Sequence, residues 1–162
     1  VHIPKKNAEK MVDYLDRVAS GKQKGLYGYN SSKPKPSTTS IAMYCQQLLG
    51  NIRGERQRES AGYLTLHQPK KEHEHQVVGC GKYHYWFYGT YAMYINGGRN
   101  WADWDDKLGP ALMEYQEKDG RWKAAGKFAK KEGDVVSTCW AIMSLSAYYR
   151  CLPILNLDFK VN

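Results

Sequence analysis

The run of residues 103–106, DWDD, is the densest group of acidic side chains in this 162-residue sequence. A carboxylic acid can protonate an apolar substrate only when burial and hydrogen bonding raise its pKa. On a helical wheel that starts at Trp101, Asp103 and Asp106 fall on the solvent side, and Asp105 falls at the border of the apolar stripe. Acidic residues in the first turns of a helix also complement its dipole. We therefore expect a surface role for this run, with Asp103, Asp105 and Asp106 as secondary candidates for catalysis.

Histidine and cysteine side chains are the second group that could do chemistry, because both bind zinc. The spacings of the candidate ligands fit no common zinc site, and the four cysteines form no C-x-x-C pair. We expect no metal and no cofactor. The candidate ligands considered are His67, His73, His75, Cys80 and His84.

Cys80 stands in the sequence GCGK, which opens an apolar segment. At the N-terminus of a helix, its thiol could have a lowered pKa and be reactive. The alternative is a structural or merely exposed cysteine, and we favour that interpretation.

Aromatic residues are unusually frequent, with 13 Tyr, 5 Trp and 3 Phe, and segment 83–95 reads YHYWFYGTYAMYI. Such rings can line a groove for an apolar ligand or stabilise a cation through their π faces. They can equally form a core of large residues, and that alternative stays open. The predicted ligand-binding residues are Tyr44, Tyr83, Tyr85, Trp86, Tyr88 and Trp140; further rings of the same layer are Tyr91, Tyr94 and Tyr148.

Two kinds of helix alternate along the chain and would position these groups. Segments 7–20, 55–67 and 100–116 have one apolar stripe and one polar face, which is typical of surface helices. Segments 38–49, 83–95 and 135–149 carry almost no charge, which is typical of buried helices. Loops rich in Gly, Pro, Ser or Lys connect them at 22–36, 70–78 and 117–133.

The alternation repeats about every 45 residues, as in stacked helical arrays. We predict an all-α domain of three stacked helical hairpins, at roughly 7–50, 55–97 and 100–150, with polar helices in an outer layer and uncharged helices in an inner layer. A β-strand at 83–95 is the alternative, but the segment is too long and lacks alternating polarity.

The length and the net charge limit the number of domains and the classes of partner. One domain suits 162 residues. The net charge of +8 is spread along the chain in short lysine runs, without a basic arm, so we expect no specific nucleic-acid binding. No apolar run approaches the ~20 residues of a membrane span, so we expect no transmembrane segment. The sequence does not indicate a cellular location.

The third hairpin carries a motif, with Leu112, Gln116, Gly120 and Trp122 standing as L-x3-Q-x3-G-x-W. It resembles the QW repeat of squalene cyclases and of protein prenyltransferase β-subunits. Segment 133–149 resembles the inner helix that follows this repeat, and the first hairpin resembles a degenerate copy. We expect Gln116 to bond the start of the next helix, Trp122 to cover the amide, and Gly120 to allow the turn through a positive φ.

The resemblance implies part of an α/α toroid, of about six helices, within a longer chain. It also indicates where the family's chemistry is missing. The residues TA that follow the acidic motif of squalene-hopene cyclases are Lys107 and Leu108 here. The histidine ligand of prenyltransferases is replaced by Ser137. The sequence GCGK around Cys80 also resembles the motif of complement-type thioester domains, but the glutamine that a thioester needs is replaced by Tyr83.

From these observations we expect a non-catalytic module that binds a protein partner or an apolar, isoprenoid-like ligand through its aromatic inner layer. The alternative is a terpene cyclase- or prenyltransferase-like enzyme domain that acts on an isoprenoid substrate.

Overall fold

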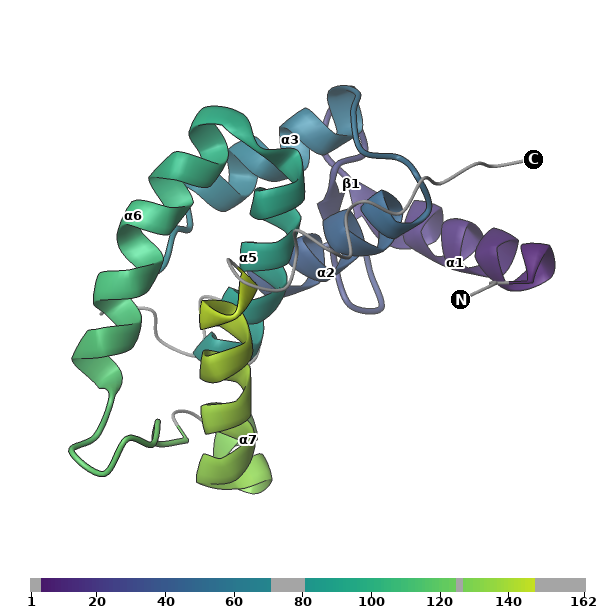
Figure 1. Cartoon of the computed structure of the whole chain (residues 1–162). Helices are drawn as coiled ribbons and strands as arrows, with labels where there is room; N and C mark the ends of the chain where they lie inside the picture. The colour runs from purple at the N-terminus through teal and green to yellow at the C-terminus, as the bar shows by residue number, and fades with distance from the viewer. Residues whose placement is uncertain (1–3, 71–80, 125–126, 148–162) are drawn as a thin grey trace.

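The computed structural model describes residues 4–70, 81–124 and 127–147. In these ranges the chain forms six packed helices and one pair of two-residue strands (Figure 1), which confirms the predicted helical fold. The elements are α1 (Lys5–Val18), β1 (Ala19–Ser20), β2 (Leu26–Tyr27), α2 (Pro36–Leu48), α3 (Glu55–Thr65), α5 (Lys82–Asn96), α6 (Gly98–Tyr115) and α7 (Lys127–Leu145). The antiparallel pair β1–β2 aligns Ala19 with Tyr27.

Helix α5 is the centre of the packing. The helices α2 and α7 lie along it, and α6 and α3 also contact it (Figure 1). Helices α2 and α5 carry almost no charge, and each of them is covered on more than one side. The part of α7 after Asp134 is also uncharged, but it packs on α5 and leaves Val135, Cys139 and Ile142 exposed. Helix α1 extends away from this group at one side of the molecule (Figure 1).

The main core lies where α5 meets α6. Trp104 of α6 is fully buried, and its indole ring approaches the backbone of Gly89 so closely that a Cβ there would lie 2.4 Å from a ring carbon. Its indole nitrogen donates to the hydroxyl of Thr90 at 3.1 Å, and its ring packs edge-on against Tyr85 at 5.8 Å between centroids. Each such ring buries enough apolar surface to contribute about 2–3 kcal/mol.

A turn after α6 holds the third hairpin together. Gly120 has φ of +86°, as predicted, and Trp122 is buried and donates its indole N–H to the carbonyl of Leu112 at 2.8 Å. The expectation for Gln116 was wrong, because its amide donates to Gly120 O at 3.0 Å within its own turn. The link to α7 is instead made by the backbone N–H of Trp122, which donates to the hydroxyl of Thr138 at 3.0 Å.

Two other boundaries differ from the expectation. The first helix ends at Val18 rather than at residue 20, because the loop after it turns back as the pair β1–β2. The carboxylate of Glu59, from α3, fixes this loop by accepting backbone N–H groups of Lys22, Gln23 and Gly25 at 2.7–3.0 Å. The predicted loop 117–133 contains a helical stretch at residues 127–132. The helix is interrupted at Gly133, where φ is +87°.

Residues at the N-terminal end form a second, smaller core. Leu15, Val18 and Ala19 pack there against Tyr27 and Ala42. The six helices by themselves do not show a ring, so the partial toroid stays a prediction. The larger part of the expected loop 70–78, the ring of Tyr148 and the end of the third hairpin lie outside the described residues.

Two helical glycines make a matched test of the core. Gly89→Ala would place a methyl group against the ring of Trp104, and we expect it to destabilise the fold by about 1–3 kcal/mol. Gly62, on the exposed side of α3, has open space around it, so Gly62→Ala should stabilise the fold by about 0.4–1 kcal/mol. Urea unfolding of both variants would measure this. Equal effects of the two substitutions would contradict the described contact.

Candidate functional site

A group of six rings from three helices remains only half-buried on the inner layer. We call it the aromatic face. Every member has an intermediate exposure, although the chain has a core that buries comparable rings completely. Its members are Tyr44 of α2, His84, Phe87, Tyr88 and Tyr91 of α5, and Trp140 of α7.

The spacing of the α5 residues explains why they share one side. Positions 84, 87, 88 and 91 follow the i, i+3, i+4, i+7 pattern of a single helical face. Tyr44 reaches this face from α2, and Trp140 reaches it from α7, because these two helices flank α5.

The rings of the aromatic face contact one another continuously. Phe87 lies 4.9 Å from the centroids of Tyr88, Tyr91 and Trp140. Tyr44 extends the network across α2, at 5.8 Å from Tyr91 and 6.2 Å from Tyr88. These separations lie in the range that favours aromatic pairs, so the surface is a connected apolar layer rather than a set of isolated side chains.

The histidine in this layer contributes an apolar ring rather than a charge. His84 packs edge-on against Trp140 at 5.0 Å, with 86° between the ring planes. Burial lowers the pKa of His84, and the carboxylate of Glu132 only partly opposes this effect. The imidazole is therefore neutral at pH 7, and the aromatic face carries no cation among its own members.

The other predicted ligand-binding residues lie in the core. Tyr83, Tyr85 and Trp86 are at most 3% exposed. Tyr85 donates its hydroxyl to the carbonyl of His67 at 2.7 Å, and Trp86 packs against Tyr115 of α6. The structure thus brings Tyr44, Tyr88 and Trp140 together on one surface and separates them from these three.

The aspartates of α6 do not meet the aromatic face. Trp104 of α6 contacts α5 at Gly89, and at 100° per residue Phe87 and Tyr91 lie about 160° around α5 from that point. Asp103 faces Arg99 at 3.6 Å on the surface. The carboxylates and the rings therefore cannot act together on one small substrate.

Asp105 nevertheless has an unusual environment. One of its carboxylate oxygens is buried and accepts no hydrogen bond from the described residues. Burial raises the pKa of Asp105, and the neighbouring charge of Asp106, which is exposed, raises it further. These surroundings favour a proton retained on Asp105.

The candidate metal ligands are only partly described. Among them, no group of three or more His, Cys, Asp or Glu side chains could hold a metal ion. His67 caps its own helix turn through Tyr63 O at 2.8 Å, and Ser137 is buried in α7. The candidates His73, His75 and Cys80 lie outside the described residues.

No helix in the described ranges has the length and apolar character that a membrane crossing requires.

Comparison with protein-family models, with curated proteins and with solved structures found no match to this chain.

Sequence reasoning missed His84 and Phe87 as members of the aromatic face. The signal was present, because both belong to the i, i+3, i+4, i+7 series of α5. A division of the α5 rings into two faces by wheel position, rather than their treatment as one set, would have found them.

Lys82 is a buried cation on the core side of α5. Its ammonium nitrogen lies 2.9 Å from the ring centroid of Tyr115 and within 6 Å of the rings of Tyr83 and Trp86. Burial lowers the pKa of Lys82 from 10.5 to about 8, whereas the charge of Glu114 raises it. The ring faces attract the cation and offset part of the cost of burying it.

The pH dependence of stability should report this lysine. Below pH 8 both states hold the proton, and the native state bears the full cost of the buried charge. Between pH 8 and about 10 the unfolded state holds more protons, so the free energy of unfolding should rise with pH, by about 1–3 kcal/mol. Urea unfolding at pH 7.5 and 9.5 measures this rise.

Lys82→Met should abolish the rise, and Lys130→Met, at an exposed position of α7, should retain it. Above pH 10 the comparison ends, because burial raises the pKa of Tyr27 to about 12 and its ionisation then favours unfolding. A rise that persists unchanged in Lys82→Met would contradict the assignment.

Proposed function

We propose that this chain is a non-catalytic module that binds a protein partner or an apolar, isoprenoid-like ligand on its aromatic face. One observation carries the proposal: six mutually contacting rings, supplied by three helices, are left half-buried on one side of α5. A connected apolar surface of this kind is typical of binding sites in soluble proteins.

The composition of the face favours an apolar occupant. Its histidine is neutral, and the indole N–H of Trp140 is buried without an acceptor in the described part of the chain. A charged ligand would lose hydration there and gain no ion pair from the face itself. An alkene chain or an apolar side chain of a partner would be stabilised by ring contacts over its whole length.

We also propose that the chain belongs with the squalene cyclase and prenyltransferase repeats. The turn of the third hairpin supports this, because Gly120 adopts a positive φ and Trp122 is buried against the preceding helix. The alternation of helices around α5 agrees with the same relationship.

A second function, in an enzyme acting on an isoprenoid substrate, is favoured by a single residue. Asp105 combines a buried, unpartnered carboxylate oxygen with a raised pKa, as a proton donor to an alkene would require. Its place on the opposite side of α5 from the aromatic face makes binding the better-supported function.

Substitutions on the aromatic face should weaken binding of an isoprenoid probe. We expect farnesol to bind the intact chain saturably, with quenching of tryptophan fluorescence, and Tyr88→Ala to weaken the affinity at least tenfold. Tyr63→Ala, which removes a half-buried ring from α3, is the matched control and should change the affinity less than twofold. Because both variants keep all five tryptophans, the same fluorescence signal serves for the intact chain and for both variants. Equal losses in the two variants would contradict the assignment of the face.

Turnover separates the two functions. Incubation with squalene or with farnesyl diphosphate, followed by mass spectrometry, should give no new product. Product formation that disappears in Asp105→Asn but persists in Asp106→Asn would overturn the proposal and support the enzyme.

A further inference from the structure

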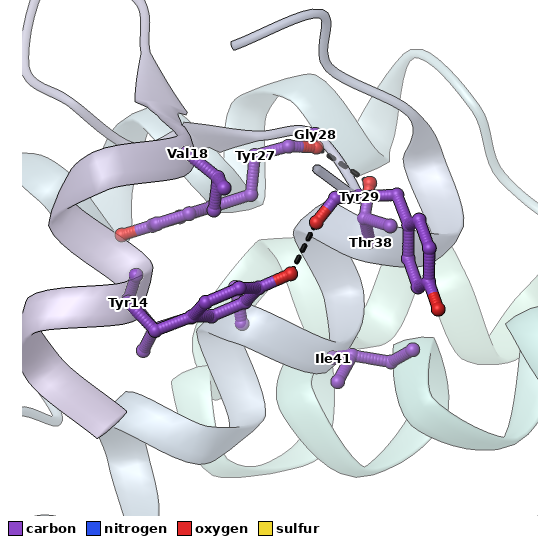
Figure 2. A pocket seen from close by; sticks show the side chains of 9 residues that line it. Tyr14, Val18, Tyr27, Gly28, Tyr29, Thr38 and Ile41 are labelled. Atoms are coloured by element: carbon purple, nitrogen blue, oxygen red, sulfur yellow. Dashed lines mark hydrogen bonds between the residues drawn. The ribbon is translucent and has the colours of Figure 1, made fainter. Parts of the chain in front are cut away.

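A separate hollow of about 170 Å³ lies at the N-terminal end of the molecule, between α1, the strand β2 and α2 (Figure 2). It belongs to the smaller core and not to the aromatic face. Figure 2 shows the rings of Tyr14 and Tyr29 on either side of Thr38 and Ile41. The full lining is Tyr14, Leu15, Val18, Tyr27, Gly28, Tyr29, Thr38, Ile41 and Ala42.

The polar groups of these walls are already used within the protein. The hydroxyl of Tyr14 donates to the carbonyl of Tyr29, and that of Thr38 donates to Tyr27 O at 2.5 Å (Figure 2). The hydroxyl of Tyr27 accepts from the amide of Gln46 at 2.7 Å. The surface that remains open toward the hollow is almost wholly carbon, so an occupant must present an apolar group to it.

The walls are held in place before anything binds. A Cβ at Gly28 would lie 1.9 Å from Ser31 O, so the chain folds back tightly over itself at this glycine. The backbone N–H of Lys35 donates to Tyr27 O at 3.0 Å and closes the loop. The backbone of Tyr29 is therefore fixed, yet its side chain is 76% exposed. When a ligand contacts this ring, only the two side-chain torsions of Tyr29 must be ordered, which limits the entropy cost.

The size of the hollow matches one ring. Cavities of about 150 Å³ with apolar linings bind benzene. At about 170 Å³ and open to solvent on one side, this hollow has room for a single six-membered ring whose substituent points outward.

Charge beside the mouth indicates what that substituent is. Lys10 and Arg17 stand one turn before and one turn after Tyr14 on the same face of α1, and the guanidinium of Arg17 lies 5.2 Å from the Tyr14 ring centroid. Neither cation is in an ion pair within the described ranges. Asp13 neighbours both cations on the helix surface, and with Glu9 it lines a different depression beside Val12 and Leu49.

We propose that this hollow binds a small aromatic acid, with its ring between Tyr14 and Tyr29 and its anionic group beside Lys10 and Arg17. This site is independent of the proposed function, because it shares no residue with the aromatic face.

The test uses three probes that share a ring and differ in charge: phenylacetate, benzyl alcohol and benzylammonium. In NMR titrations of the full chain, phenylacetate should shift the signals of Val18, Ile41 and Ala42 saturably, with a dissociation constant of about 1 mM. Benzyl alcohol should bind about fivefold more weakly, and benzylammonium more weakly still. The double variant Lys10→Gln/Arg17→Gln should bind phenylacetate and benzyl alcohol equally.

Two variants test whether the ring of phenylacetate lies in the hollow. Ala42→Val should fill the hollow and Tyr29→Ala should remove one wall, and each should weaken phenylacetate binding at least fivefold. Leu66→Ala, an equally exposed apolar residue of another region, should leave it unchanged. Tyr29→Ala keeps the test valid if Ala42→Val fails to fold. The proposal is overturned if no saturable shift occurs up to 20-fold the expected constant, if benzylammonium binds as tightly as phenylacetate, or if Tyr29→Ala has no effect.

Discussion

The structure depends on the enclosure of α5. This helix carries large rings around nearly its whole circumference, so it has no polar side to turn toward water. It must be covered by other helices, and α2, α6 and α7 are placed where they cover it. The cover is complete toward α6, where Tyr85 and Trp86 are fully buried, and incomplete on the opposite side, where Phe87 and Tyr88 remain half-exposed. The same helix therefore supplies both the core and the proposed binding surface.

The close packing of the core side explains why function is assigned to the other side. Gly89 has no side chain, and the indole of Trp104 occupies the space this leaves, so that the two helices approach closely and leave no room for a ligand. Among the buried residues that the structure describes, Lys82 is the only one with a charged side chain, and three rings surround it there. The surrounding packing offsets the free-energy cost of burying its charge. The rings enclose the ammonium group, so it is not available to a substrate.

Much of the helical plan could be predicted from the sequence, because the uncharged segments and the one-sided segments differ so clearly in periodicity. The strands β1 and β2 could not, since the carboxylate that organises their loop comes from Glu59, far along the chain. The helical stretch before Gly133 was missed because its lysines and glycines read as a loop. The six predicted ligand-binding residues could be named from the sequence but not separated into core and surface. All three segments that carry them are apolar, and whether a ring is buried depends on which side of its helix the neighbouring helices cover. The hollow beside Tyr14 and Tyr29 depends on a loop folded over Gly28, which local sequence does not indicate.

The rings of α5 are divided between a closed side and an open side, and both the core and the proposed binding surface depend on this division. Hydroxyl-radical footprinting with mass spectrometry measures the solvent access of individual rings in the free protein. We predict rapid oxidation of Tyr44, Tyr88 and Trp140 and strong protection of Tyr85, Trp86 and Trp104. Equal oxidation of the two groups, or protection of Tyr88 together with exposure of Trp86, would contradict the account.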